Sequence, residues 1–357
     1  MKKANFEDTP ASVKPVVSIV VPCRNERDQI ETAIQSILAQ EPPPGEFEVI
    51  VADGMSDDGT RSILLKLAKE NSRLRIVDNP AGTVSTGLNA AIREAKGSVI
   101  MRMDAHTGYA RDYVRNCLEV LKRTGADNVG GAWVARGMGI IGSAIASAFQ
   151  SPFSFGGTRG HNPNYEGTVE TVYLGCWPRS VFDRIGLFDE ELVRNQDDEF
   201  NLRLTRSGGK IWQSPAIKSW YIPRTSLYGL FRQYMQYGYW KVRVIQKHRL
   251  PASVRHLIPG GFVLSFILLF VASFKWSLAS QSWIALASAY SACNITASCA
   301  TAARHGWKLL PVLPAVFACY HFAYGYGFLR GAWDFVILRR GPHPAYKTLS
   351  RTSARTS

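Results

Sequence analysis

Short apolar runs alternate with amphipathic segments along the first hundred residues. The runs are rich in β-branched residues and lack polar alternation, as expected for strands buried on both faces of a parallel sheet. The segments between them carry apolar residues at helical spacing. This order predicts an α/β domain with a doubly wound, mostly parallel sheet. The predicted strands are residues 16–21, 47–52, 74–77 and 98–106, and the predicted helices are residues 28–40, a segment ending near 71, and 84–96.

Acidic side chains follow two of these strands. Asp53 follows the second strand, and Asp104 and His106 close the fourth. Open α/β sheets bind ligands at the carboxyl ends of their strands, where the strand order reverses. Two metal-capable side chains at that edge favour a divalent ion and a phosphorylated ligand. An acid that closes a strand is also a common turn former or helix cap, so a purely structural interpretation stands beside this one.

The turn after the first strand argues against one class of ligand. Its sequence, Pro-Cys-Arg-Asn-Glu at residues 22–26, contains no glycine. A dinucleotide-binding domain needs glycines at this turn so that the backbone can approach the pyrophosphate. The sequence has no Walker loop either. The phosphates of a ligand would therefore be held by a metal and by side chains.

The last third of the chain has the composition of a membrane-associated region. Residues 226–249 are aromatic and basic, which is typical of a helix at a membrane interface. Three apolar segments follow at residues 258–274, 283–303 and 309–329, and prolines and glycines interrupt the third. The first is about long enough to span a bilayer.

The net charge of +14 is concentrated around these segments, in residues 224–255 and after Arg339. This placement favours a surface facing anionic lipid over a nucleic-acid partner. Three spans would separate the basic tail, with Arg340 and Lys347, from the first domain, against the positive-inside tendency. An even number of spans, or a re-entrant third segment, would keep the tail on the same side. The N-terminus lacks the apolar core of a signal peptide, so we expect the first domain to stay in the cytoplasm.

The six cysteines form no CxxC pair and show no metal-ligand spacing. We expect them to be reduced, buried residues of a protein that faces the cytosol. They are Cys23, Cys117, Cys176, Cys293, Cys299 and Cys319.

Five short motifs carry a resemblance to a known family. They are Val-Pro-Cys-Arg-Asn-Glu at 21–26, Val-Ala-Asp-Gly-Met-Ser-Asp-Asp-Gly-Thr at 51–60, Gly-Leu-Asn-Ala-Ala at 87–91, Asp-Ala-His at 104–106 and Asn-Gln-Asp-Asp-Glu-Phe-Asn-Leu-Arg-Leu at 195–204. In this order they resemble the family 2 glycosyltransferases, which have the GT-A fold, a Rossmann-like α/β fold with a mostly parallel sheet. The resemblance covers roughly residues 15–240. It is greatest to bacterial exopolysaccharide transferases of the succinoglycan type, which add glucose to a lipid-linked sugar and carry C-terminal transmembrane helices.

The resemblance implies a nucleotide site at the ends of the first two strands. Asp53 would hold the uridine end of the donor, near the base or the ribose. Asn25 and Glu26 would complete this pocket, together with Pro22 and Ser56.

The resemblance also implies a metal site. Asp104 would hold a divalent metal that bridges the two phosphates, and a metal or fixed cations would meet the charge of the leaving diphosphate. The usual family motif is Asp-x-Asp, and this chain has His106 at the second position. Imidazole suits Mn²⁺ better than Mg²⁺, so the metal stays open between these two. Arg102 either reaches the donor or anchors the sheet.

Two aspartates lie in the last motif. In the family's position Asp198 would be the general base that takes the proton of the acceptor hydroxyl. Asp197 stands where the family often has Glu and would orient or bind the acceptor. Plain helix caps are the alternative for both. Trp177 would either stack on a sugar ring or belong to the core, and residues 151–162 form either a mobile acceptor loop or a plain surface loop.

The expected organisation follows from these assignments. It comprises a flexible leader at 1–15, a GT-A glycosyltransferase domain at 16–225, an amphipathic basic segment at 226–255, a membrane region at 256–332 and a basic tail at 333–357.

The resemblance implies a metal-dependent, inverting glycosyltransferase at the bacterial inner membrane, with its catalytic domain in the cytoplasm. It would move a hexose, most simply glucose from UDP-glucose, to a polyprenyl-diphosphate-linked saccharide. One alternative is a processive polysaccharide synthase, but the Gln-x-x-Arg-Trp motif of processive relatives is missing near 233–240. The other is an inactive membrane scaffold that keeps the nucleotide fold, which the His106 departure suggests.

Overall fold

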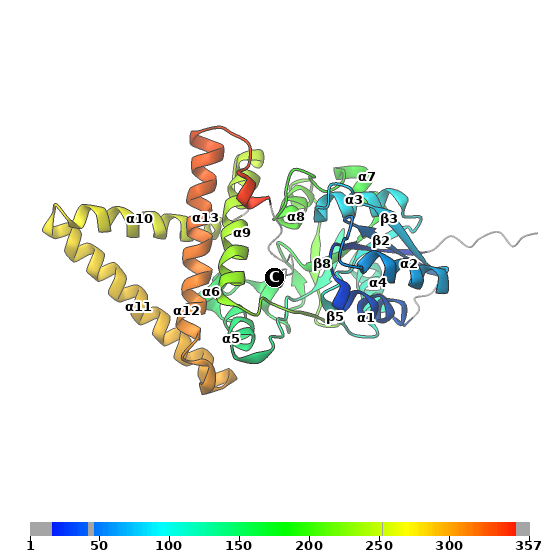
Figure 1. Cartoon of the computed structure of the whole chain (residues 1–357), viewed down its shortest axis with the longest axis horizontal. Helices are drawn as coiled ribbons and strands as arrows, with labels where there is room; N and C mark the ends of the chain where they lie inside the picture. The colour runs from blue at the N-terminus through cyan, green and yellow to red at the C-terminus, as the bar shows by residue number, and fades with distance from the viewer. Residues whose placement is uncertain (1–15, 42–45, 252, 348–357) are drawn as a thin grey trace, which may run out of the picture.

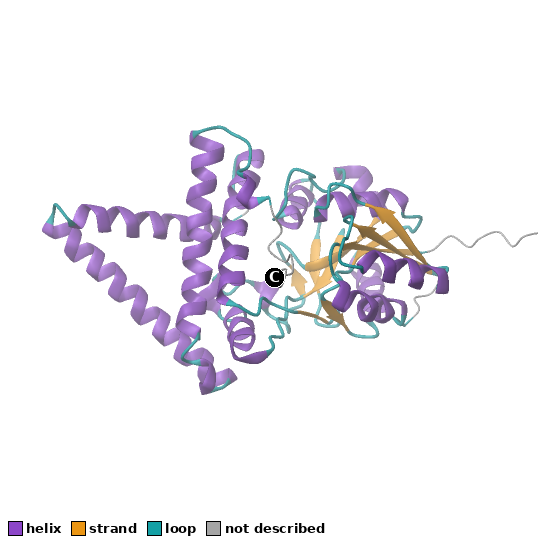
Figure 2. Cartoon of the chain, in the orientation of Figure 1, coloured by secondary structure: helices purple, strands orange, loops and turns teal. Residues whose placement is uncertain are grey.

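A computed structural model describes residues 16–41, 46–251 and 253–347. An α/β domain built around a sheet lies beside a group of helices from the C-terminal part of the chain (Figures 1 and 2). The two parts are in contact along α9, the helix Leu227–His248.

The main sheet has eight strands in the order β3-β2-β1-β4-β8-β6-β9-β7. Strands β1 to β4 pair in parallel, and antiparallel pairing begins where β8 joins β4. The strand order reverses at β1, which lies between β2 and β4. The strands are β1 (Val17–Cys23), β2 (Phe47–Asp53), β3 (Leu74–Asp78), β4 (Val99–Arg102), β6 (Asn128–Gly131), β7 (Gly167–Thr168), β8 (Tyr173–Pro178) and β9 (Ile211–Gln213).

Both faces of this sheet are covered, which explains the uninterrupted apolar runs. Ile19 and Val21 of β1 belong to one buried cluster with α1 (Arg27–Leu38), α2 (Thr60–Glu70) and α4 (Tyr113–Thr124). Val20 belongs to the cluster on the other face, with α3 (Val84–Glu94), α7 (Arg179–Ile185) and α8 (Gln196–Arg206). The predicted doubly wound sheet is therefore confirmed.

The fourth predicted strand is shorter than expected. It ends at Arg102, and Asp104 and His106 lie in the loop that follows. The chain then forms β5 (Thr107–Tyr109), which pairs antiparallel with β10 (Ser219–Tyr221) in a separate two-stranded sheet. This second pairing turns the chain out of the main sheet.

The remaining helices form the second part of the molecule, and α5 and α6 precede the others in the chain. They are α5 (Gly139–Phe149), α6 (Pro152–Phe155), α9 (Leu227–His248), α10 (Ile258–Ser273), α11 (Ser277–His305), α12 (Leu313–Ala318) and α13 (Tyr324–Gly331). Two π-helical segments extend these helices: Cys319–Ala323 joins α12 to α13, and Ala332–Ile337 follows α13. Single 3₁₀ turns occur at Arg159–His161, Val254–His256, Trp307–Leu309 and Pro344–Tyr346.

The third predicted span is not broken by its glycines. Residues 313–337 form one helical column that packs along α9 (Figure 1). A Cβ atom added to Gly327 would lie 1.9 Å from the carbonyl oxygen of Met235, and one added to Gly238 would lie 2.0 Å from that of Tyr324. The glycines thus allow close contact between two helices.

Helices α10 and α11 project from the rest of the molecule and meet at its far end (Figure 1). Among the described residues, one helix, Val254–Ser273, is long and apolar enough to cross a membrane. Several of its large side chains are exposed, including Leu268 and Val271. The expectation of buried cysteines holds for Cys23, Cys117 and Cys176, whereas Cys293 on α11 is exposed.

Candidate active site

The carboxyl ends of β1, β2 and β4 lie side by side. Cys23 at the end of β1 pairs with Asp53 at the end of β2, and Arg102 of β4 pairs with Val20 of β1. The loops that carry Asn25, Asp53 and Asp104 therefore meet at the point where the strand order reverses.

A hydrogen-bonded turn joins the first two loops. Asp53 is fully buried, and its Oδ1 accepts a hydrogen bond from Ser56 Oγ at 2.6 Å. The backbone N–H of Asn25 donates to the same Ser56 oxygen at 2.9 Å, and the Asn25 side chain bonds Asp57. Asn25 has φ of 53°, a left-handed conformation that asparagine tolerates. Pro22 lies within β1, just before this turn.

Arg61 is a partner of Asp53 that the motifs did not indicate. From the first turn of α2 it pairs with Asp53 at 2.9 Å and with Asp78, at the end of β3, at 2.7 Å. The signal in the sequence was its place at the start of the helical segment that follows Asp53. It compensates the buried charge of that carboxylate.

Arg102 and Asp104 form a buried, bidentate ion pair. Nε and Nη2 of Arg102 donate to the two carboxylate oxygens of Asp104 at 2.8 and 2.9 Å. Burial opposes the charge on Arg102, but Asp104 outweighs it and raises the pKa of the guanidinium. The Asp104 N–H also donates to the hydroxyl of Tyr109 at 2.6 Å. These bonds anchor Arg102 at the carboxyl end of β4, and a contact of Arg102 with the donor stays a prediction.

His106 lies between two carboxylates. Its Nδ1 is 3.7 Å from Glu26 Oε1, and its Nε2 is 4.0 Å from Asp104 Oδ2. Among the described residues no group of three His, Cys, Asp or Glu side chains is arranged to hold a metal ion. Asp104 and His106 suit a site in which the protein supplies two ligands and the phosphates of a donor supply the others. Glu26 lies within ion-pair distance of the His106 ring.

Trp177 is not available to a sugar. It is 2% exposed, and its ring packs edge-on against Phe182, Phe188 and Phe200. These contacts place it in the core between β8, α7 and α8, so the stacking interpretation is wrong and the core interpretation is confirmed.

Residues 151–162 also differ from the expected mobile loop. They form α6 and a 3₁₀ turn, with Phe153 packed edge-on against Phe317 and Phe155 against Tyr320. The carbonyl of Phe153 lies 2.9 Å from a ring nitrogen of His321. This segment is therefore docked on the helical part of the molecule.

Asp197 and Asp198 open α8 and have different surroundings. Asp198 forms an ion pair with Lys241 of α9, whose Nζ lies 2.6 Å from Oδ2. Burial alone would raise the pKa of Asp198, but Lys241 lowers it below its ordinary value. Burial and the charge of Asp198 raise the pKa of Asp197, against the influence of Arg102. Asp197 thus lies within electrostatic reach of the Arg102–Asp104 pair, and Asp198 is bound to α9.

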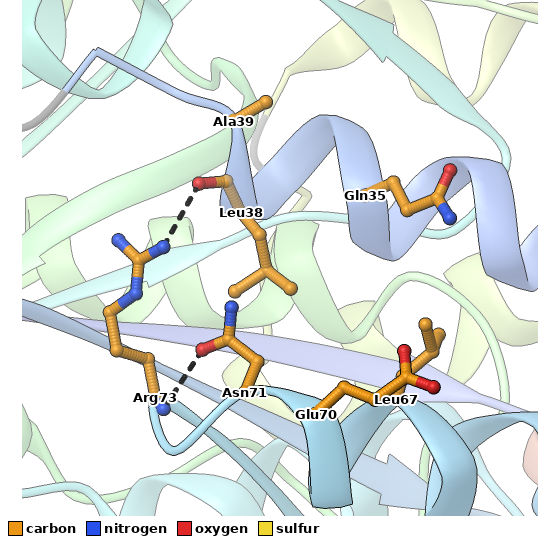
Figure 3. A pocket seen from close by; sticks show the side chains of 7 residues that line it. All are labelled: Gln35, Leu38, Ala39, Leu67, Glu70, Asn71 and Arg73. Atoms are coloured by element: carbon orange, nitrogen blue, oxygen red, sulfur yellow. Dashed lines mark hydrogen bonds between the residues drawn. The ribbon is translucent and has the colours of Figure 1, made fainter.

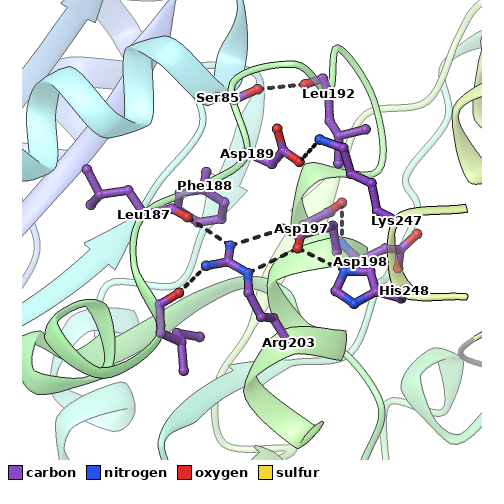
Figure 4. A network of polar contacts seen from close by, with 12 residues as sticks. Ser85, Leu187, Phe188, Asp189, Leu192, Asp197, Asp198, Arg203, Lys247 and His248 are labelled. Carbon is purple, nitrogen blue, oxygen red and sulfur yellow. Dashed lines mark hydrogen bonds and ion pairs between the residues drawn. The ribbon is translucent and has the colours of Figure 1, made fainter. Parts of the chain in front are cut away.

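The loop before α8 makes polar contacts with α3 and α9 (Figure 4). Ser85 of α3 donates to the carbonyl of Leu192 at 2.6 Å, and Lys247 of α9 pairs with Asp189. Arg203 donates to the carbonyls of Leu187 and Ile185. The start of α8 is therefore held in a fixed position.

Three cations of α9 pair with carboxylates of the α/β domain. Lys241 pairs with Asp198, Arg243 with Glu191 and Lys247 with Asp189 and Glu191. Lys241 is 4% exposed. Sequence reasoning missed it as a site residue because its partner lies 43 positions away.

A shallow depression between α1 and α2 is separate from this site (Figure 3). It is lined at the C-terminal ends of both helices, where Arg73 donates to the carbonyl of Leu38. Helices between parallel strands run back across the sheet, so this depression lies at the opposite edge from Asp53 and Asp104.

Comparisons with known proteins agree with this arrangement. A family model described as Glycosyl transferase family 2 matches residues 18–186. Succinoglycan biosynthesis protein ExoA of Rhizobium meliloti is 34% identical over 243 residues, which cover 68% of this chain and 73% of the relative. A dolichyl N-acetyl-alpha-D-glucosaminyl phosphate 3-beta-D-2,3-diacetamido-2,3-dideoxy-beta-D-glucuronosyltransferase of Methanococcus voltae is 25% identical over 70% of this chain and 80% of that protein.

The fold has a solved counterpart. Mannosyltransferase PcManGT from Pyrobaculum calidifontis, solved in complex with GDP-Man and Mn²⁺, has a TM-score of 0.56 to this chain at 21% identity, over 89% of this chain and 88% of that one. The structure thus has the GT-A fold, with a mostly parallel sheet. The match to ExoA over most of both chains, together with the family model over residues 18–186, shows that this chain belongs to the family 2 glycosyltransferases.

Proposed function

We propose that this chain is an inverting hexosyltransferase of exopolysaccharide biosynthesis. It moves one hexose to a polyprenyl-diphosphate-linked saccharide at the cytoplasmic face of the bacterial inner membrane. The proposed donor is UDP-glucose, and the hexose is therefore glucose. The observation that carries this proposal is the carboxylate pair Asp197–Asp198 beside the Arg102–Asp104 pair at the sheet edge. The relative named for succinoglycan biosynthesis supports the pathway class.

In this proposal the turn around Asp53 binds the nucleotide. Asp53 is fixed by Ser56 and Arg61. Asn25 closes the same turn from the β1 side. The uridine of the donor lies against this turn, with its diphosphate directed toward Asp104 and the sugar toward α8.

Asp104 and His106 are the proposed metal ligands. Both lie in the loop after β4, and Glu26 flanks the imidazole. Asp104 and His106 would hold a divalent cation, Mn²⁺ or Mg²⁺, which would offset the charge of the departing diphosphate. Arg102 holds Asp104 in place at the buried edge of the sheet.

Asp197 is the better candidate for the general base, in place of Asp198. The ammonium group of Lys241 lies 2.6 Å from the carboxylate of Asp198 and occupies it. Burial and the charge of Asp198 raise the pKa of Asp197, as suits a proton acceptor. The hydroxyl oxygen of the acceptor attacks the anomeric carbon as the bond from that carbon to the diphosphate oxygen breaks. The hydroxyl proton passes to Asp197, and the nucleoside diphosphate leaves with the electron pair. A single displacement inverts the anomeric carbon, so an α-linked donor gives a β-linked product.

Membrane attachment is proposed through Val254–Ser273 and the exposed apolar side chains of α10. The contact between α9 and the 313–337 column then keeps the active site close to the lipid surface from which a polyprenyl acceptor would be taken. Asp334 of this column is fully buried and pairs with Arg340, which anchors the start of the basic tail next to α9.

A donor panel tests the proposal. The full-length protein in detergent would be assayed with UDP- and GDP-hexoses and a prenyl-diphosphate-linked sugar, in Mn²⁺, Mg²⁺ or EDTA. We expect one UDP-hexose to be consumed, one sugar to be added per acceptor, and EDTA to stop the reaction. A ladder of longer products would instead indicate a processive synthase, and no consumption of any donor would indicate an inactive scaffold.

A further inference from the structure

Helix α5, which follows β6, is packed at one end and exposed at the other. It is an apolar helix without a charged residue. In its second half, Ile145 and Phe149 are buried in a cluster with residues of α9 and α12. In its first turn, Ile140 and Ile141 are 56% and 37% exposed, and Met138 just before the helix is 71% exposed. Three large apolar side chains thus lie on the molecular surface at the start of α5.

Helix α5 adjoins the turn that follows α11. It contacts the turn Trp307–Leu309, and Leu309 belongs to the same buried cluster as Ile145. Ile141 lies one helical turn before Ile145 and therefore on the same face of α5. Trp307, two residues before Leu309, is 62% exposed. We call the exposed apolar side chains of these two segments the α5 surface: Met138, Ile140, Ile141 and Trp307.

Basic side chains accompany this surface, whereas the segments that form it lack acidic residues. Arg304 and His305 end α11, and Lys308 lies in the next turn. All three are exposed. Residues 128–150 and 277–323 contain no Asp or Glu. The α5 surface is thus apolar with a positively charged margin.

The α5 surface lies where the projecting helices rejoin the rest of the molecule. Helix α11 returns from the far end to the lower end of the 313–337 column, next to α5 (Figures 1 and 2). It carries no charged residue before Arg304. On α10, Leu268 and Val271 are 58% and 62% exposed. A bilayer that takes up these side chains would therefore also meet the α5 surface.

We propose that the α5 surface binds anionic phospholipid and forms a second membrane contact beside α10. Apolar side chains enter the headgroup boundary of a bilayer, tryptophan is enriched at that boundary, and Lys and Arg are attracted to anionic lipid. A second copy of this chain would bring the cations of two such surfaces together, whereas anionic lipid complements them. The assignment rests on the proposed membrane attachment.

This contact would act on the catalytic domain directly. Helix α5 lies within residues 18–186, which the family model matches. It follows β6, and the carboxyl ends of β6 and β4 lie at the same edge of the sheet, because both strands run antiparallel to β8. Lipid bound at α5 would therefore hold the edge of the sheet that carries the candidate active site toward the membrane.

Photocrosslinking tests the assignment. The full-length protein would be placed in nanodiscs made of equal parts of phosphatidylcholine and phosphatidylglycerol, with the photoreactive residue benzoylphenylalanine at one position. Replacement of Ile140 or Trp307 tests the α5 surface. Replacement of Leu268 on α10 is the positive control, and replacement of Leu65, which is 47% exposed on α2, is the solvent control. Mass spectrometry measures the yield of crosslinked lipid and the ratio of phosphatidylglycerol to phosphatidylcholine in it.

We expect lipid crosslinks from Ile140 and Trp307 but not from Leu65. At Ile140 the crosslinked lipid should be enriched in phosphatidylglycerol. R304Q and K308Q should each lower this ratio about fivefold, since each cation near an anionic surface contributes about that factor. K275Q is the matched control, because Lys275 lies in the turn between α10 and α11, at the far end of both helices. It should change the ratio less than about twofold.

Crosslinks between two copies of the chain at Ile140, or a lipid yield no higher than at Leu65, would overturn the assignment. An unchanged ratio in both R304Q and K308Q, or an equal fall in K275Q, would overturn it as well. If Leu268 gave no lipid crosslinks either, the proposed membrane attachment would fail together with this assignment. Because crosslinking needs no turnover, failure to consume any UDP-sugar would contradict the proposed activity alone.

Discussion

Lys241 of α9 places its ammonium group 2.6 Å from a carboxylate oxygen of Asp198 on α8. The lysine is almost fully buried and comes from a helix outside the residues matched by the family model. The ion pair makes two adjacent aspartates unequal, because Asp198 is held in its charged form and Asp197 has a raised pKa. Helix α9, which precedes the apolar helix Val254–Ser273, thus contributes to the candidate active site.

Replacing Lys241 tests its role as a positioning residue. Its charge favours the ionised form of both carboxylates, so K241M should raise the pKa of Asp197 and Asp198. The base is active when deprotonated, and activity is lost as the pH falls through its pKa. We therefore expect the acid limb of the kcat profile to move to higher pH, so that the loss of kcat grows as the pH falls.

The groups that face this pair define the controls for K241M. Arg102 and Lys241 act on Asp197, and Arg255 and His256 act with Lys241 on Asp198. K241R should restore the profile, and K247M on the same helix should leave it in place. An unshifted acid limb in K241M would show that Lys241 only stabilises the fold.

His106 offers a test of the metal site. H106D recreates the Asp-x-Asp motif, and carboxylate oxygens suit Mg²⁺ better than imidazole does. We expect the ratio of kcat/KM in Mn²⁺ to that in Mg²⁺ to fall in this variant, and H106A to weaken metal activation roughly 10- to 100-fold. Titration of each metal against initial rate measures both. If H106A and wild type respond identically to both metals, His106 is not a ligand.

The close contact between α9 and the C-terminal column can be tested with one methyl group. A Cβ at Gly238 would lie 2.0 Å from the carbonyl of Tyr324, whereas one at Gly261 of α10 would meet nothing within 4 Å. G238A should lower the thermal midpoint, with a cost of about 1–3 kcal/mol from overpacking. G261A should be neutral or slightly stabilising, by up to about 1 kcal/mol, since alanine favours helices. Equal midpoints for the two variants would contradict the packing described here.

The sheet and its site loops were predictable because their signals are local. The apolar runs of β1 to β4, and the aspartates at the ends of β2 and beyond β4, are each read within a few residues. Strand 98–106 was predicted too long because β5 pairs with β10, more than one hundred residues later. The residues around position 106 do not reveal which distant strand will pair there.

The roles of α9 were not predictable for the same reason. Its basic and aromatic composition also suits a membrane interface, and the partners of Lys241 and Lys247 lie on a loop and helix more than forty residues away. Trp177 shows the same limit, since neither its type nor its neighbours in the sequence reveal that Phe182, Phe188 and Phe200 surround it. Tertiary contacts decide which of two plausible roles such residues take.

The comparison of D197N with D198N tests the central claim most directly. Asparagine keeps the shape of each side chain and removes its ability to take a proton. We predict that D197N lowers kcat at least 100-fold while UDP affinity stays unchanged, and that D198N costs only about tenfold, since general bases contribute roughly 10²–10⁴ in rate. A D197N enzyme that keeps its turnover, beside an inactive D198N enzyme with intact UDP binding, would contradict the assignment of Asp197 as the proton acceptor.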